Sequence, residues 1–454
     1  MTNQERATFG SKLGVILASV GSAVGLGNIW RFPYEAGQNG GAAFLLVYIG
    51  CVLLLGLPVM LTEFFIGRHS KSNAFGAFNV LAPGTRWNLI GIMFVIAAFF
   101  ILGFYSVISG WTLEYLWQSL SNSLGHQSTA EYASEFTAFT SHNFRPLIWT
   151  MVFLLLTHFI ISAGVQKGIE RASKIMMPLL FIFITILAIR SIMLPNGMEG
   201  LKFLFQPDFS KINSKVIISA LGQAFFSLSI GMGTLITYSS YFSSDTKLVK
   251  TALSVITLDT LVAVMAGVII FPAVFSFGIA PSQGTELVFI TLPNVFQQMP
   301  FSIFWATIFY LLLAVAALTS TISMHEVATA FVNEELKIDR KKAAWIVTGI
   351  VMVLGVLSTL SFGILKENTI FGLTVFELLD FVTAKVMLPI GGMLICYFVG
   401  WRIDKKVLKA ELTNNGTVPF YFFNGFSFVL RFIAPAAIAL IFLNELGAFK
   451  FFQS

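Results

Sequence analysis

Charged side chains are scarce in this sequence of 454 residues. Asp, Glu, Lys and Arg make up 11% of the chain, whereas 56% of the residues are hydrophobic and 48 of them are Phe. An ordinary soluble domain carries charge on roughly 25% of its residues. Repeated apolar runs of about 20 residues are instead typical of helices that cross a bilayer. The composition therefore predicts an all-α membrane protein that needs only one helical domain, residues 1–454, surrounded by lipid.

Cysteine is almost absent as well. Cys51 and Cys396 both fall inside apolar runs, which argues against a disulfide framework. No cleavable signal pattern occurs in the N-terminal stretch MTNQERATFGSK, so we expect the first apolar run to remain as a spanning helix. The sequence contains no HExxH or GxSxG motif, and His325-Glu326 lacks the second His of a zinc motif. It thus gives no indication of an enzyme, and the net charge of +6 carries no nucleic-acid signature.

Eleven apolar runs are long enough to span a membrane. They lie at residues 13–36, 42–68, 88–120, 146–163, 168–192, 216–240, 248–276, 302–333, 341–361, 371–399 and 421–447. With the N-terminus inside, 18 of the 28 Lys and Arg residues fall in cytoplasmic segments and six in outer segments. This bias predicts a cytoplasmic N-terminus and an extracellular C-terminus in the cell inner (plasma) membrane. We also expect the Gly- and Pro-containing stretch 277–300 to fold back as an external lid.

The first run contains a stretch that is unsuited to a plain membrane helix, GSAVGLGNIWRFPY. Its three glycines each cost roughly 1 kcal/mol against Ala in a helix interior. Gly21 and Gly25 could form a small-xxx-small packing face, but that alternative does not account for polar Asn28 and Arg31 in hydrocarbon. Backbone unwound at membrane depth is tolerated where it lines a cavity. We therefore expect a broken helix built around a site.

The sixth run is interrupted in the same way and reads GQAFFSLSIGMGTLITYSSY, with Gly231 and Gly233 at its centre. Interruptions in corresponding spans predict an inverted repeat of five plus five helices. Residues 1–192 would form the first repeat and 216–399 the second. Residues 421–447 would then be an additional span.

These motifs resemble those of the neurotransmitter:sodium symporter family. The resemblance extends to Asn39-Gly40-Gly41, Phe44, Gly67-Arg68, Ser109-Gly110-Trp111, KGIERASK at 167–174, ALTSTIS at 317–323 and Leu379-Asp380-Phe381. The resemblance implies sodium-coupled symport by alternating access. The sequence is similar to the bacterial leucine and hydrophobic amino-acid carriers, some of which also stop after eleven spans. A channel remains an alternative for any helical bundle, although broken paired helices with buried ligands suit occlusion better. Nothing in the sequence indicates an oligomeric state.

The resemblance implies two sodium ions held by oxygen ligands. The first set comprises the Ala23 carbonyl, Asn28, Ser227, Asp259 and the carboxylate of the substrate. The second set comprises the carbonyls of Gly21, Val24 and Ala316 and the hydroxyls of Thr319 and Ser320. Glycine-rich breaks free such carbonyls, although an isolated Thr-Ser pair more often bonds to its own helix.

Gly25 bears on the class of substrate. Family members that carry monoamines have an Asp at this position, whereas here no side chain fills the space beside the half-helix N-terminus. The resemblance therefore implies a zwitterionic amino acid as substrate, with its carboxylate at Gly25. Tyr105 matches the family's pocket tyrosine and would hydrogen-bond that carboxylate; without the resemblance it is an ordinary core tyrosine.

The substrate pocket that the resemblance implies contains no charged side chain. Its residues are Ala23, Gly25, Ile101, Tyr105, Phe226, Ser227, Ser229, Met232, Ser320 and Met324. Unbranched methionines at 232 and 324 repack readily around ligands of different size, although Met also commonly fills core gaps. We expect a broad pocket for neutral aliphatic and aromatic L-amino acids.

Charged pairs are expected at both ends of the path. Arg31 and Asp380 resemble the family's external gate, and charges inside spans are costly unless they are paired. Arg6 and Glu334 would form the inner gate, although both lie at helix ends where a solvated surface is an equal alternative. Lys385 lies five residues past Asp380 and has no assignment beyond pairing with Asp380 or Glu377.

Asp259 is the least expected residue of the seventh span. Animal family members need chloride near the first sodium, held partly by a hydroxyl one turn further along, where this chain has Ala263. An ionised Asp at mid-membrane costs about 3 kcal/mol, which a nearby sodium would offset. An Asp held neutral or paired with a base is the alternative, but spans six and seven offer no Lys or Arg at that depth. We therefore expect transport that is independent of chloride.

Overall fold

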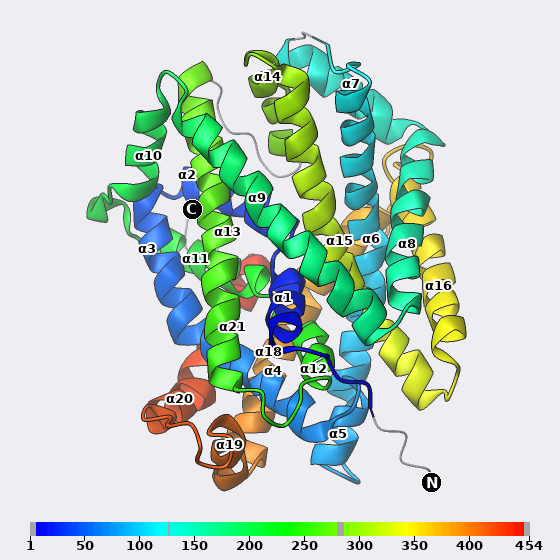
Figure 1. Cartoon of the computed structure of the whole chain (residues 1–454), viewed down its shortest axis with the longest axis vertical. Coiled ribbons are helices and arrows are strands. Elements are labelled where there is room, and N and C mark those ends of the chain that lie inside the picture. Colours follow the sequence, from blue (N-terminus) through cyan, green and yellow to red (C-terminus); the bar gives the residue numbers. More distant parts are fainter. Residues whose placement is uncertain (1–5, 126–127, 279–285, 449–454) are drawn as a thin grey trace.

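The computed structural model describes residues 6–125, 128–278 and 286–448, and helices dominate these residues. Nine of the described helices are long and apolar enough to cross a membrane. A tenth crossing is the bent pair Lys12–Ala23 and Gly27–Gln38, whose two parts meet at 57°. The broken pair α11 and α12 completes the eleven predicted spans. In Figure 1, α1 and α12 lie in the middle of the bundle.

The spans follow one another in the predicted order. They are α1 (Lys12–Ala23) with η1 (Gly27–Arg31) and α2 (Phe32–Gln38); α3 (Ala42–Cys51) with η2 (Val52–Gly56) and α4 (Leu57–Ser70); α6 (Asn88–Leu120); α8 (Arg145–Ser162); η3 (Val165–Glu170) with α9 (Arg171–Ile192); α11 (Ser214–Ser227) with α12 (Thr234–Ser239); α13 (Leu248–Phe277); α15 (Ser302–Glu335); α16 (Arg340–Leu360); α17 (Val375–Asp380) with η6 (Phe381–Met387), α18 (Leu388–Tyr397) and η7 (Phe398–Arg402); and α20 (Phe423–Phe428) with η8 (Val429–Ile433) and α21 (Ala434–Glu445).

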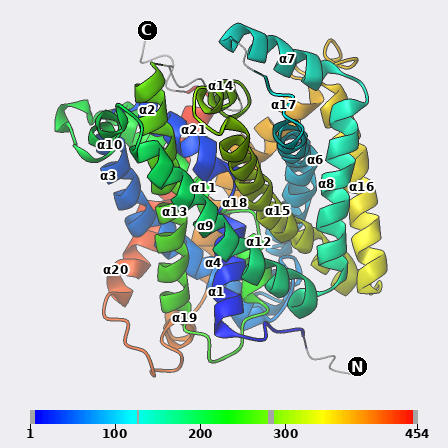
Figure 2. The same ribbon diagram turned by 45° about the horizontal axis from the view of Figure 1, so that its top comes forward.

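Shorter helices connect the spans. They are α5 (Gly76–Leu81), α7 (Thr129–Ser141), α10 (Gly197–Phe205), η4 (Phe209–Lys211), η5 (Leu287–Thr291), α14 (Leu292–Gln297) and α19 (Lys405–Leu412). The expected lid, 277–300, folds into η5 and α14 where it is described, and its residues 279–285 lie outside the described part of the chain. Figures 1 and 2 place α7, α10 and α14 at one end of the bundle and α19 at the other.

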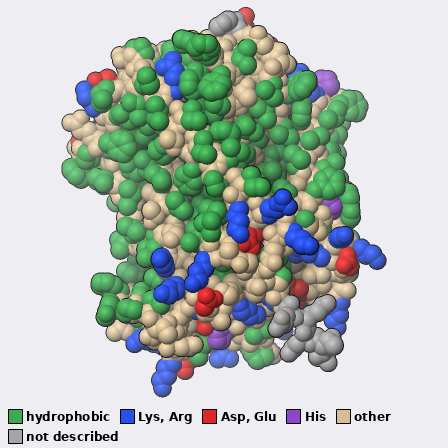
Figure 3. All heavy atoms as spheres, viewed as in Figure 1, with side chains coloured by type: hydrophobic (Ala, Val, Ile, Leu, Met, Phe, Trp, Pro, Cys, Tyr) green, Lys and Arg blue, Asp and Glu red, His purple; other side chains and the backbone are tan. Residues whose placement is uncertain are grey.

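The outer surface of the bundle suits a bilayer. Large apolar side chains point away from the protein, for example Phe159 with 61% of its surface exposed and Val353 with 61%. Figure 3 shows apolar side chains over most of the visible face, while Lys and Arg gather in its lower half. Exposed apolar surface of this extent marks contact with a membrane. The chain is therefore a multi-pass membrane protein.

Proline explains most of the π-helical turns. The turns η1, η2, η5, η6 and η8 are each followed directly by a helix with Pro in its first two positions: Pro33, Pro58, Pro293, Pro389 and Pro435. The proline ring has no N–H and clashes with the carbonyl four residues earlier. Widening the preceding turn to i→i+5 hydrogen bonds removes the clash, and it rotates the residues of that turn about the helix axis.

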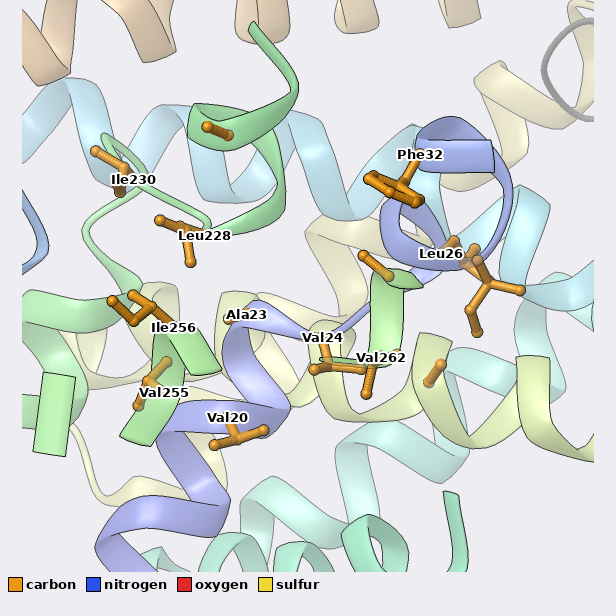
Figure 4. Close-up of a cluster of buried hydrophobic side chains, with 14 of the residues drawn as sticks. Val20, Ala23, Val24, Leu26, Phe32, Leu228, Ile230, Val255, Ile256 and Val262 are labelled. Atoms are coloured by element: carbon orange, nitrogen blue, oxygen red, sulfur yellow. The ribbon is translucent and has the colours of Figure 1, made fainter. Parts of the chain in front are cut away.

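Apolar side chains surround both interrupted spans. Figure 4 shows Val20 and Val24 of the first span, Leu228 of the sixth, and Val255 and Val262 of α13 around the breaks. All five are fully buried. Such packing keeps bulk water from the backbone that the breaks expose, so protein groups must pair with its N–H and C=O groups.

Candidate functional site

The break in the first span begins where α1 ends at Ala23. Val24 adopts an extended conformation (ψ 119°), and the helix resumes at Gly27. Side chains take over the hydrogen bonds that the helix loses: Gly25 N–H donates to Asn28 Oδ1 at 3.0 Å, and Leu26 N–H donates to Tyr105 Oη at 3.2 Å. The predicted break is therefore present, and polar residues of the predicted site hold it open.

The break in the sixth span lies between α11 and α12. Ser229, Gly231 and Gly233 have left-handed backbone angles, with φ of 53°, 80° and 73°. Gly231 N–H donates to Glu63 Oε1 at 2.7 Å, and the Ser229 hydroxyl donates to the Ser22 carbonyl at 2.9 Å. The second of these bonds ties the two broken spans to each other. A Cβ at Gly231 would lie 2.5 Å from a backbone carbonyl of α18, so this position requires glycine.

A cavity of about 540 Å³ opens beside both breaks. That volume falls within the range of small-molecule sites. All ten residues predicted for the substrate pocket line it: Ala23, Gly25, Ile101, Tyr105, Phe226, Ser227, Ser229, Met232, Ser320 and Met324. Sequence reasoning missed Ser22, whose buried hydroxyl has no partner among the described residues, and the aromatic residues Phe104 and Phe225. The available signal was that Ser22 and Phe225 lie near the breaks in sequence and that Phe104 precedes Tyr105.

Three buried polar side chains meet beside this cavity. Asn28 Nδ2 lies 2.9 Å from Ser227 Oγ and 2.8 Å from Asp259 Oδ1, and the Ser227 hydroxyl donates to Asp259 Oδ2 at 2.6 Å. Asp259 has no exposed surface, and no ion pair with a described Lys or Arg compensates it. The Tyr48 hydroxyl, which the sequence analysis missed, reaches Ser227 Oγ at 3.3 Å. A buried carboxylate among hydroxyl and carbonyl oxygens fits a hard cation.

The side-chain oxygen of Asn28 does not face Asp259 and Ser227, so in this orientation it cannot bind a cation there. Its NH₂ group faces Asp259 and Ser227, while Oδ1 accepts the Gly25 N–H. Rotating the amide by half a turn would present Oδ1 to a cation in the cluster. The same rotation would turn the amide NH₂ toward the Gly25 N–H, which would then need another acceptor.

The second predicted ligand set joins α15 to the break of the first span. The Ser320 hydroxyl lies 3.3 Å from the Val24 carbonyl, and Thr319 Oγ1 lies 3.5 Å from the same oxygen. Thr319 also donates to the Ala316 carbonyl of its own helix at 2.9 Å. Gly21 packs against Thr319, since a Cβ there would lie 3.3 Å from the Thr319 Cβ. The five residues thus converge, and Thr319 makes the local back-bond that the sequence left as an alternative.

The outer end of the cavity is not closed by its predicted pair. Arg31 and Asp380 both line the cavity, but they form no ion pair in the described structure. Arg31 instead lies over the Phe226 ring, 4.5 Å from its centroid, with Nε 3.9 Å from Glu35 Oε1. The role of Arg31 and Asp380 as a gate remains a prediction.

The inner end is closed by several contacts. Arg6 Nη1 lies 2.6 Å from Glu334 Oε2, and the Arg6 guanidinium also donates to Ser240 Oγ at 2.7 and 3.0 Å. Phe9 N–H donates to the Tyr241 carbonyl at 3.1 Å, and the buried Phe9 ring meets Tyr241 edge-on. The contacts of Arg6 and Phe9 thus seal this end of the bundle, whereas Arg31 and Asp380 at the other end of the cavity are not paired with each other.

A second ion pair supports this inner closure. Arg340 Nη2 lies 2.6 Å from Glu326 Oε2, and the Tyr241 hydroxyl donates to Glu326 Oε1 at 2.6 Å. Sequence reasoning considered Glu326 only as part of an incomplete zinc motif. The available signal was that a fully buried acid requires a cation, and Arg340 begins the next span.

Eleven spans, two of them broken around a shared cavity that opens at one end, define a secondary-active carrier. Comparison with known proteins identifies the family of carriers to which the chain belongs. The model of the sodium:neurotransmitter symporter family matches residues 6–145 and 137–453. The chain belongs to this family, and it is a sodium-dependent transporter and not an enzyme.

Individual relatives are similar over almost their whole lengths. An uncharacterized sodium-dependent transporter of Bacillus subtilis (strain 168), YhdH, is 41% identical, over 99% of this chain and 100% of that protein. An uncharacterized sodium-dependent transporter of Haemophilus influenzae is 36% identical, over 98% and 99%. The crystal structure of MhsT in complex with L-phenylalanine is 46% identical, with a TM-score of 0.88 over 97% of this chain and 100% of that one.

The closed inner end leads to a prediction about the N-terminal segment. Substituting Arg6→Ala removes the contacts with Glu334 and Ser240, so the segment should detach more often and the Phe9 amide should exchange its hydrogen at least several-fold faster. Hydrogen–deuterium exchange on the peptide containing Phe9 measures this. Lys12→Ala is the control, because the Lys12–Asp245 pair is solvent-exposed and 3.8 Å apart. Equal exchange in the Arg6→Ala variant and the unmodified protein would show that Arg6 does not hold this end closed.

Proposed function

We propose that this protein uses the sodium gradient to carry neutral hydrophobic L-amino acids, aliphatic and aromatic, into the cell. The observation that carries the proposal is the convergence of all ten predicted pocket residues on one cavity beside two groups of oxygen ligands. The complex of MhsT with L-phenylalanine supports the same substrate class, since that protein is 46% identical to this chain.

The α-carboxylate of the substrate binds at Gly25. A Cβ on Gly25 would lie 2.6 Å from Ser320 Oγ and 3.2 Å from Tyr105 Oη, so a side chain would fill the space that the carboxylate needs. Tyr105 Oη already accepts the Leu26 N–H and can donate its own hydrogen to the carboxylate. Family members that carry monoamines have an aspartate at this position, and that side chain would fill the space. Its absence here argues against a monoamine substrate.

The substrate side chain lies among uncharged groups. Ile101, Phe226, Met232 and Met324 supply apolar surface, and the nearby hydroxyl of Ser229 is already bonded to the Ser22 carbonyl. A charged substrate side chain would lose its hydration here without gaining a partner. Flexible Met232 and Met324 allow both Leu-sized and aromatic side chains to fit.

Two sodium ions couple to this substrate. The first is bound by the Ala23 carbonyl, Asn28, Ser227 and Asp259 together with the substrate carboxylate. Binding turns the Asn28 amide so that Oδ1 faces the ion, which frees the Gly25 N–H for the carboxylate. Sodium thereby prepares the substrate site directly.

The second sodium is bound between the first span and α15. Its ligands are the carbonyls of Gly21, Val24 and Ala316 and the hydroxyls of Thr319 and Ser320. The Ser320 hydroxyl already lies near the Val24 carbonyl, so an ion there needs only small movements of the ligands. It would fix the broken span against α15 in the sodium-loaded state.

Asp259 removes the need for chloride. Its carboxylate is fully buried beside Ser227, and the position one turn further along α13 is Ala263, which has no group to bind an anion. A fixed negative charge then balances the first sodium permanently. The two ions carry net charge with a zwitterion, so at roughly 2.3 kcal/mol per charge per 100 mV the membrane potential contributes to accumulation.

The proposed orientation places the end that carries α19 in the cytoplasm. Lys and Arg gather toward this end, as cytoplasmic segments do. The N-terminus is then cytoplasmic, the open cavity faces outward, and the C-terminus is extracellular. In a bacterial cell the protein lies in the inner membrane.

The direct test of this function is uptake into proteoliposomes with an imposed inward sodium gradient. We expect labelled L-leucine and L-phenylalanine to accumulate, more so with the interior negative, and choline in place of sodium to abolish uptake. Replacing chloride by gluconate at fixed sodium should leave the rate unchanged, because Asp259 supplies the negative charge. A several-fold fall in gluconate would mean that Asp259 is not the substitute anion, whereas uptake without sodium would contradict the coupling itself.

Met232 provides a test of the side-chain subsite. Met232→Phe introduces a rigid ring between Gly231 and Gly233, so the pocket should shrink and L-tryptophan should compete against labelled L-leucine at least several-fold less well. Competition assays measure the ratio of the two inhibition constants. Met193→Phe, the same change at a position that is 72% exposed, should leave the ratio unchanged. If tryptophan and leucine shift together in Met232→Phe, Met232 does not set substrate size.

A further inference from the structure

One cation on the wall of the outer cavity has no role in the function proposed above. Lys385 belongs to η6 and lines the cavity together with Asp380 of α17 and Glu445 of α21. Its ammonium lies 3.7 Å from the Glu445 carboxylate and 5.8 Å from the centre of the Phe381 ring. Lys385 thus links the tenth span to the eleventh at the mouth of the cavity.

The backbone is built so that Lys385 reaches this position. Residues five apart in an α-helix point about 140° away from each other, so Lys385 would face away from Asp380. The π-helical turn Phe381–Met387 has i→i+5 hydrogen bonds, which bring residues five apart nearly into line. Pro389 favours the wide turn, because its ring would otherwise clash with the carbonyl of Lys385 four residues earlier. Both charged side chains therefore face the same cavity.

Asp380 shares the cavity wall with two positive charges and one negative charge. Arg31 of the first span, Lys385 of its own span and Glu445 of the eleventh span all line the same cavity. Arg31 is held on Phe226 and near Glu35. The Lys385 side chain is 40% exposed and that of Glu445 30%, so the pair is partly hydrated and can rearrange.

We propose that Lys385 is a positioning residue that keeps the outer gate open until substrate and sodium are bound. The inference rests on the proposed function and on the predicted outer gate, in which Arg31 would move to Asp380 when the cavity closes. Lys385 opposes this movement in two ways: it offers Asp380 another counter-charge, and it repels the approaching Arg31. Glu445 sets the strength of this opposition, because it neutralises Lys385 from the eleventh span.

This arrangement predicts opposite effects for the two partners. In Lys385→Met, Arg31 has no competitor for Asp380, closure over the substrate becomes easier, and KM should fall roughly two- to fivefold. In Glu445→Gln, Lys385 is no longer neutralised, closure becomes harder, and KM should rise by a similar factor. The double variant should resemble Lys385→Met more than Glu445→Gln, since the cation that opposes closure is absent from both.

The experiment measures the sodium-driven uptake of labelled L-leucine into proteoliposomes, normalised to the amount of folded protein, and the equilibrium binding of the same substrate. Lys385→Arg, which keeps the charge, should restore the KM of the unmodified protein. Lys366→Met removes an exposed lysine from the loop between α16 and α17 and should leave KM unchanged.

Shifts of KM in opposite directions for the two single variants would establish the proposal. Equal shifts in the same direction, or none, would overturn it, and so would a double variant that resembles Glu445→Gln. If the unmodified protein itself shows no sodium-dependent uptake of L-leucine, the proposed function fails first; normal uptake with unchanged KM in every variant would overturn the role of Lys385 alone.

Discussion

The molecule depends on one constraint: backbone that is unwound inside a dry bundle must find hydrogen-bond partners from side chains. The backbone N–H groups of Gly25, Leu26 and Gly231 donate to side-chain oxygens of Asn28, Tyr105 and Glu63, respectively, with N···O distances of at most 3.2 Å. These partners come from different elements, so the two breaks fix the relative positions of the first, second, third and sixth spans. Asn28 and Tyr105, which stabilise the first break, also border the cavity. In the proposed function the same two side chains therefore support the break and meet the ligands.

The two ends of the substrate path differ in how closely their charged side chains are paired. At the inner end, Arg6–Glu334 and Arg340–Glu326 are close ion pairs sealed by Tyr241. At the outer end, the cavity wall carries charges that are not fully paired with one another. Alternating access then requires strong contacts to break at one end while new ones form at the other, and the bound ions and substrate supply the free-energy difference. In the proposed function, Asp259, which is buried between these ends, supplies the negative charge that a sodium ion requires.

The sequence predicted the fold and the composition of the site because both leave local signals. Glycines at 25, 231 and 233 mark breaks that no plain membrane helix would tolerate, and the buried Asp259 has no base near it in sequence. The contact of Arg31 with Glu35 was missed although the two residues are four apart in the first span, because only Asp380 was considered as the partner of Arg31. The expected pairing of Lys385 with Asp380 or Glu377 was wrong, since its ammonium lies beside Glu445 of the eleventh span, and the reason is local. An α-helical register turns it away from the cavity, and only the π-helical turn next to Pro389 brings it back.

The central claim is that Asp259 is a ligand of the sodium ion that prepares the substrate site. The sodium dependence of labelled L-leucine binding, compared between the unmodified protein and Asp259→Asn, tests it most directly. Asparagine keeps the size of the side chain and removes its charge. The account predicts that the variant stays folded, as judged by its melting temperature, but needs at least tenfold more sodium for half-maximal binding, about 1.4 kcal/mol. A sodium titration that is identical in the two proteins would contradict it.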